Sequence, residues 1–375
     1  MVNLTYRHRA AACVPIAIAI AIALSRAVSA AALPATVAIL PVAPFLEPRP
    51  GGDAANFDIV VRNPDPVIAE ISEISVLYLD RLGHVLIERR ADSNGTVPAL
   101  VTLGDLTLAA GERKLIFNRF PRLPPDMHPL RVCVRVTLTE NADTPNERTS
   151  IVDALASFRP PTEAGRRLKS PLAGHVLVWD GHDALAHHRR WNFELPTLTA
   201  LGYHANGMRY AYDLTRVDML GHRFSGDRDT HGTNYSFNQP VRSPDDGVVV
   251  ETENDRPDDG SADLNSFKAR PNLMFGNYIV IRLADEVYAL LGHLHQGSLR
   301  VRVGEGVRAG QTVAAVGNSG TSLFPHLHFQ LMTGPNMATA EGVPSAFQGV
   351  TLDRGGRTQP DQSGEIDSGD IANLD

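Results

Sequence analysis

The chain has 375 residues, of which 43% are hydrophobic and 21% charged, a composition typical of globular proteins with room for two domains. Its formal net charge of -7 argues against a general nucleic-acid-binding protein, which normally presents a basic surface.

Residues 1–30 have the pattern of a secretory signal peptide. The basic stretch YRHR precedes the apolar run AAACVPIAIAIAIAL, and AVSA supplies the small residues that signal peptidase prefers. The apolar run of about 15 residues is shorter than the roughly 20 that span a membrane. We therefore expect cleavage after Ala30, a secreted or periplasmic protein, and no membrane association after cleavage; an uncleaved anchor is the alternative.

Residues 35–160 predict an immunoglobulin-like β-sandwich. Segments such as FDIVVRN, ISEISVLYLD and LRVCVRVTLTE alternate apolar and polar residues, and turn formers such as NPDP and SNGT separate them. The region shows no cluster of residues that would indicate chemistry. RPPTEAGRR then interrupts the pattern as a linker.

Residues 170–352 predict a second, histidine-rich domain of β-strands. Strand-like segments include HVLVWDG, RYAYDLTRV, PVRSPDDGVVVETE and NYIVIRLADEVYALLGHL. Residues 353–375 are rich in Asp, Gly and Ser and poor in large apolar residues, so we expect a disordered acidic tail.

The stretch HLHFQL carries the clearest chemical signal. On a strand, His326, His328 and Gln330 share one face, while Leu327 and the other intervening residues pack into a core. Two imidazoles on one strand can serve one site, one as a metal ligand and one in proton transfer, but a lone H-x-H is weak evidence.

The surrounding sequence makes the signal specific. PVRSPDDGVVV, GNYIVIRLADEVYALLGHL and VRVGEGVRAGQTVAAVGNSGTSLFPHLHFQL, within roughly residues 205–350, resemble the zinc metallopeptidases of the lysostaphin and LytM type, the M23 peptidases. Parts of the same stretch also resemble biotinyl and lipoyl carrier domains, but the hairpin lysine that those need is missing. The M23 resemblance implies an antiparallel, barrel-like catalytic β-domain.

The resemblance also implies roles for individual residues. Asp213 in RYAYD and His328 match the family's zinc ligands, whereas His293 in GHL and His326 match its two catalytic histidines. By this resemblance His326 would move protons and His293 would stabilise the oxyanion of the tetrahedral intermediate. His295 lies outside the family motif and is interpreted as structural.

One position departs from the family pattern. Arg209 stands where the family has the first histidine of H-x-x-x-D, and an arginine cannot bind zinc because its guanidinium stays protonated. Catalytic zinc usually has three protein ligands, so another side chain must complete the set. We favour His188 in AHHRR, with His204 as the second candidate; a basic surface patch is the alternative interpretation of AHHRR.

The resulting hypothesis is a zinc-dependent endopeptidase that cuts peptide bonds in bacterial peptidoglycan. The alternative is a catalytically silent relative that binds wall peptides or activates a partner amidase, suggested by Arg209. The presence of Asp213, His293, His326 and His328 favours the enzyme. The sequence does not assign a role to the N-terminal domain.

Overall fold

The computed structural model describes residues 35–49, 51–93, 95, 97, 100, 104–159, 166–353, 357–361 and 363–375. The predicted signal peptide (residues 1–30) and most of the predicted linker lie outside these residues. The regular secondary structure of the described part is almost entirely β-strand, as the sequence predicted. None of its helices is long and apolar enough to cross a lipid bilayer.

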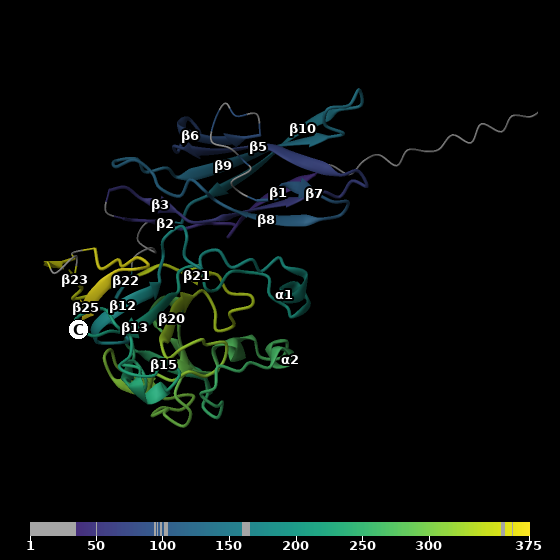
Figure 1. The fold of residues 1–375 in the computed structure, drawn as a ribbon. Coiled ribbons are helices and arrows are strands. Elements are labelled where there is room, and N and C mark those ends of the chain that lie inside the picture. The colour runs from purple at the N-terminus through teal and green to yellow at the C-terminus, as the bar shows by residue number, and fades with distance from the viewer. Residues whose placement is uncertain are drawn as a thin grey trace, which may run out of the picture.

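The N-terminal unit packs two antiparallel sheets around one apolar core (Figure 1). One sheet has the order β1 (Thr36–Leu40), β4 (Asp58–Arg62), β8 (Arg113–Phe117). The other has the order β10 (Arg148–Ser157), β9 (Arg131–Glu140), β5 (Ala69–Leu79), β6 (Val85–Asp92), with β7 (Thr107–Leu108) paired to β5 and a separate ribbon of β2 (Leu46–Glu47) and β3 (Ala54–Ala55). This arrangement is the two-layer sandwich that the alternating segments predicted; its immunoglobulin-like topology stays a prediction.

The C-terminal unit is organised around one long antiparallel sheet. Its strand order is β18 (Gly306–Val307), β15 (Gly247–Glu253), β16 (Asn277–Arg282), β17 (Tyr288–Leu294), β20 (Leu327–Met332), β13 (Tyr212–Arg216), β12 (Gly174–Asp180), β25 (Ile371–Leu374), β23 (Thr351–Asp353), β24 (Thr358–Pro360), with β21 (Gly342–Val343) paired to β20.

Short elements complete this unit. They are the pairs β14 (Pro240–Arg242) with β19 (Thr312–Ala315) and β11 (Arg166–Leu168) with β22 (Ser345–Phe347), the helices α1 (Pro196–Ala200) and α2 (Leu264–Phe267), and the 3-10 turns His231–Thr233, Pro271–Phe275 and Ala284–Glu286. The central strands β13, β17 and β20 carry most of the residues that the sequence singled out.

The prediction of a disordered tail is wrong for the described residues of 353–375. Strand β25 pairs with β12 in the main sheet, and Ile366, Ala372 and Leu374 are buried in its core. The tail has few apolar residues, but these three pack into the core, and β25 is hydrogen-bonded on both sides, to β12 and to β23. Two tail acids, Glu365 and Asp367, also contact an arginine of the N-terminal unit.

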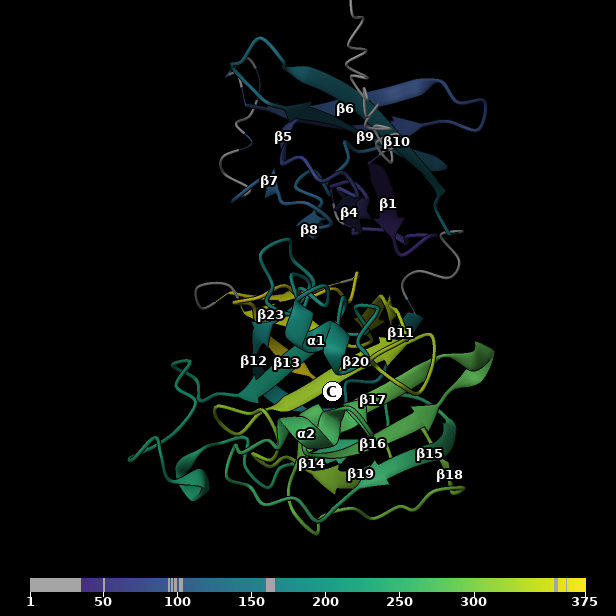
Figure 2. The same ribbon diagram turned by 90° about the vertical axis from the view of Figure 1, so that its right-hand side faces the viewer.

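The two units share a buried interface. The three-stranded sheet lies between the five-stranded sheet and the C-terminal unit in both views (Figures 1 and 2). Val60 and Leu115 of that sheet join a core cluster with Phe193 and Tyr203 of the C-terminal unit. Because this contact is apolar as well as ionic, the interface resembles a continuous core.

Candidate metal centre

Asp213 and His328 lie side by side on neighbouring strands. They are direct cross-strand partners in the β13–β20 ladder, the pairing that brings side chains closest together. The Nδ1 atom of His328 is 3.1 Å from Oδ1 of Asp213. The structure therefore brings together the carboxylate and the imidazole that the sequence predicted as ligands.

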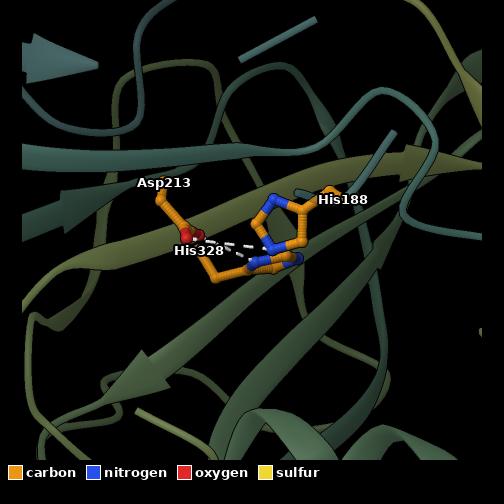
Figure 3. Close-up of side chains that lie close together, drawn as sticks. All are labelled: His188, Asp213 and His328. Carbon is orange, nitrogen blue, oxygen red and sulfur yellow. Dashed lines mark hydrogen bonds and ion pairs between the residues drawn. The ribbon is translucent and has the colours of Figure 1, made fainter. Parts of the chain in front are cut away.

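His188 reaches the same point from the segment that follows β12 (Figure 3). Its Nε2 atom lies 3.8 Å from Oδ2 of Asp213, and its ring centroid is 4.8 Å from that of His328. One donor atom from each of the three residues lies within 4.8 Å of the others. Of the two upstream candidates, His188 is thus the one that joins the pair.

The other upstream histidine stands apart from this cluster. His204 is exposed and lines a different cavity, beside Glu194 and Leu195. His295 turns away as well, with its Nδ1 2.5 Å from Oδ2 of Asp258 in a loop.

Asp180, which sequence reasoning missed, fixes His188. It ends β12, and its two carboxylate oxygens accept the backbone N–H groups of His187 and His188 at 2.7 and 2.9 Å. Its Oδ2 also lies 2.6 Å from Nδ1 of His188. A carboxylate behind a histidine in this way sets the tautomer and leaves Nε2 for a metal. The signal was an acid at the end of a strand shortly before paired histidines.

Gln330 sets the tautomer of His328, as Asp180 does for His188. The two side chains share one face of β20, as predicted, and Nε2 of His328 donates to Oε1 of Gln330 at 2.7 Å. Nδ1 is then the atom free to coordinate an ion. Leu327, Phe329 and Leu331 point into the core on the opposite face, again as predicted.

His293 and His326 flank the cluster, with ring centroids 4.8 Å apart. The Nδ1 of His293 donates to the Ser319 carbonyl and that of His326 to the Phe324 carbonyl, both at 2.8 Å. Each neutral ring therefore presents an unprotonated Nε2. The Nε2 of His326 lies 3.4 Å from Oδ1 of Asp213.

The backbone of His293 has φ of 57°, a left-handed conformation that is uncommon for a residue with a side chain. Such strain, about 1–3 kcal/mol, persists only where the surroundings enforce it. Here the bond to Ser319 and the antiparallel pairing of β17 with β20 hold the ring toward His326. The strain thus accompanies a fixed ring orientation.

Burial and neighbouring charges set the protonation states. Burial disfavours the Asp213 carboxylate, but the electrostatic effects of the adjacent His188 and His326 rings, with hydrogen bonds from His326 and His328, outweigh it and hold the pKa of Asp213 well below the usual value. Burial, together with His326 and His328, places the pKa of His293 well below its usual range. Burial also lowers the pKa of His328. Asp213 is thus an anion and His293 neutral around pH 7.

For His188 burial opposes the proton, yet the adjacent Asp213 and Asp180 carboxylates raise its pKa. A proton on Nε2 would have to leave before this atom could bind a cation. The negative charges of the two carboxylates, which raise the pKa of the His188 ring, would also attract a bound metal cation.

The donor set fits a zinc ion. Zinc prefers four-coordinate sites with nitrogen and oxygen donors about 2.0–2.2 Å from the metal. Two imidazoles and a carboxylate supply such donors here, with one donor atom of each within 4.8 Å of the others. The cluster opens into a cavity of about 330 Å³. His188, Asp213 and His328 would hold the ion, and the cavity side would be left for water or substrate.

Arg209 lies outside the metal centre, in the interface between the two units. One of its guanidinium nitrogens is 2.7 Å from Oδ2 of Asp58 in β4 and 3.6 Å from Glu341. The other oxygen of Asp58 accepts from Arg189 at 3.0 Å. All three members of this Arg189–Asp58–Arg209 triad are buried. Asp58 is a residue of the site's surroundings that sequence reasoning missed.

Comparison with known proteins agrees with the resemblance in the sequence. Residues 229–340 match the model of peptidase family M23, a stretch that includes His293, His326 and His328 but begins after Asp213.

Among solved structures, the catalytic domain of the antimicrobial peptidase lysostaphin from Staphylococcus simulans is 25% identical, with 32% of this chain and 86% of that chain covered and a TM-score of 0.22. A prophage-encoded M23 protein from Enterococcus faecalis is 22% identical, with 33% of this chain and 85% of that chain covered and a TM-score of 0.22. A putative M23 peptidase from Pseudomonas aeruginosa is 11% identical, with 75% of this chain and 93% of that chain covered and a TM-score of 0.26. These TM-scores are too low to add to the sequence match. Residues 229–340 are thus the part of the chain that is similar to peptidase family M23.

Proposed function

We propose that the chain is a zinc-dependent endopeptidase that hydrolyses peptide bonds of bacterial cell-wall peptidoglycan, acting as a secreted or periplasmic protein. The observation that carries the proposal is the meeting of His188, Asp213 and His328 at one end of a cavity that His293 and His326 also line.

Zinc, when bound, would polarise the substrate carbonyl and bring the pKa of water to about 7. His326 has a lone pair on Nε2 because its Nδ1 proton is engaged by the Phe324 carbonyl. It can therefore take the proton of the attacking water and return it to the leaving amine. Its Nδ1–H bond keeps the ring oriented in both states.

His293 in its neutral form has the same tautomer, because Nδ1 donates to the Ser319 carbonyl. Its Nε2 is then an acceptor, which suits orienting the water. Stabilising an oxyanion, the role that the family resemblance suggested, would require a second proton on this ring. The lowered pKa of His293 disfavours that proton in the resting enzyme, so we assign it the orientation of water.

The observation that suggested a catalytically silent protein has another explanation. It was suggested by the missing histidine at Arg209, but the ionic contacts of Arg209 are with Asp58 and Glu341, while His188 supplies the third donor. In this proposal His188, Asp213 and His328 supply the three donors, so the ligand set does not need position 209.

The test uses the full mature chain. We expect about one zinc ion per chain by elemental analysis and release of soluble muropeptides from purified peptidoglycan. A folded, zinc-loaded chain that releases none would contradict the enzymatic proposal, and a folded chain that takes up no zinc would contradict the metal centre itself.

A further inference from the structure

Beside the metal centre, an arginine is held over two aromatic rings. The guanidinium carbon of Arg223 lies 4.6 Å from the centroid of the Trp179 ring and 4.1 Å from that of Phe324. The two rings meet edge to face at 5.0 Å. Contacts of this kind fix a guanidinium plane and leave its N–H edges available.

The two rings of this platform of Trp179, Arg223 and Phe324 lie at the cavity of the metal centre. Trp179 and Phe324 both line that cavity, and the Phe324 ring centroid is 5.0 Å from that of His326. Trp179 directly precedes Asp180, which fixes His188. Arg223 is therefore one aromatic ring away from the histidine that we assign to proton transfer.

The backbone also holds Arg223 in place. It lies in the loop after β13, where its carbonyl accepts the Tyr235 N–H at 2.9 Å. The neighbouring Phe224 forms a bridge with Asn234. Both the backbone and the guanidinium group of Arg223 are thus restrained. Ligand binding would therefore cost less conformational entropy.

Among the described residues, Arg223 has no carboxylate within ion-pair distance. The acids of its own loop are engaged elsewhere: Asp218 with His222, Asp227 with Thr230, and Asp229 with Arg228. Partial burial and the charge of Arg228 lower the pKa of Arg223, in keeping with a positive charge that lacks a counter-charge.

We propose that Arg223 binds a carboxylate of the substrate and makes the enzyme selective for peptides that carry a free carboxylate near the cleaved bond. This inference rests on the proposed function and names its substrate class. A guanidinium fixed in plane pairs with a carboxylate through two parallel hydrogen bonds. A sugar ring, the other common ligand of aromatic rims, would have to displace Arg223 from the ring faces that it covers.

The test compares cross-linked wall peptides that are identical except for free or amidated carboxylates. We expect kcat/KM to be about tenfold higher for the free form with the wild-type chain. In Arg223→Gln this ratio should fall to about one, and Arg223→Lys should be intermediate. The matched control Arg228→Gln, an exposed arginine of the same loop, should keep the wild-type ratio.

A wild-type ratio near one, or a ratio that Arg223→Gln preserves, would overturn the inference. Calorimetry with the same two peptides and the metal-free chain separates it from the proposed function. If no peptide is cleaved, the enzymatic proposal fails, but tighter binding of the free form that disappears in Arg223→Gln would still support the carboxylate site. Equal binding of both forms, with tighter binding of a peptide-free glycan strand, would assign the rim to sugar instead.

Discussion

Asp58 of the N-terminal unit lies 2.7 Å from Arg209 and 3.0 Å from Arg189, and so is the shared counter-ion of two buried arginines of the C-terminal unit. Arg189 directly follows His188. Asn56 and the Phe57 carbonyl accept further hydrogen bonds from the same guanidinium. The N-terminal unit thus anchors the segment that carries a proposed metal ligand, which gives this unit a structural role in the site.

The first prediction concerns Asp58. Replacing it by Asn leaves Arg189 and Arg209 buried without their shared counter-ion, a change that typically costs about 3–5 kcal/mol. We expect a loss of this size in the free energy of unfolding, measured with urea. Zinc affinity should fall as well, because the chain next to His188 loses its anchor.

A matched control is the exposed pair of Arg135 and Asp153 in the same unit, joined at 2.8 Å. Asp153→Asn should cost less than about 1 kcal/mol, because solvent screens an exposed pair, and should leave zinc affinity unchanged. Equal losses in Asp58→Asn and Asp153→Asn would contradict an anchoring role for Asp58.

The sequence singled out His188, Asp213 and His328, which the structure brings together; their roles as metal ligands stay predictions. The alternation of polar and apolar residues in HLHFQL predicts a strand with His326 and His328 on one face. Asp213 is identified by its position in RYAYD, which matches the family motif. His188 was favoured because it follows the strand-like segment HVLVWDG and because the family resemblance extends to the AHHRR stretch. These inferences needed the family resemblance and the number of protein ligands that catalytic zinc prefers, and no knowledge of contacts between distant segments.

The features that were missed depend on contacts between distant segments. Asp58 is separated from Arg189 by 131 positions and lies in a region without any cluster of chemical residues. The composition of the tail predicts disorder because its few apolar residues are averaged with many polar ones. Two of these apolar residues, Ile366 and Leu374, are nevertheless buried in the core. Arg209 looked like a lost ligand because no sequence pattern reveals its partner.

The second prediction concerns the ligand set. His188→Ala should remove zinc from the purified chain. Asp180→Asn should keep the ligand but weaken zinc affinity about 10–100-fold, as losses of such supporting carboxylates do. Both are measured by competition with a zinc-binding dye.

The adjacent His187 provides the control, because it is exposed and its replacement by Ala should leave zinc affinity unchanged. His204→Ala tests the second upstream candidate and should also have no effect. Loss of zinc in His204→Ala with full retention in His188→Ala would reverse our assignment.

The third prediction concerns removal of the metal. A chelator should stop muropeptide release and lower the thermal midpoint, because an ion bound only by the folded chain stabilises it by about 4 kcal/mol at a thousandfold excess over its Kd. Added zinc should restore both properties. In His328→Ala, which lacks a ligand, the midpoint should not respond to the chelator. A response of the same size there would place the stabilising ion elsewhere.

A second ionic contact between the units sets up the last prediction. Arg49 of the N-terminal unit faces Glu47, Glu365 and Asp367, and its Nε lies 3.1 Å from Glu365. Of the three acids, Glu47 also has His182 at 3.1 Å. Burial, together with the negative charge of Glu47, raises the pKa of Glu365 to about 8 from its usual 4.5. One arginine thus faces more carboxylates than it can neutralise.

Between these two pKa values the folded chain holds a proton that the unfolded chain has released, so stability should fall as the pH rises through this window. Glu365→Gln mimics the protonated acid and should reduce the fall between about pH 6 and about pH 9, measured by urea unfolding at both values. The exposed Glu70→Gln should behave like the wild type. An identical fall in Glu365→Gln would show that Glu365 is already ionised in the folded chain, with Arg49 as its partner.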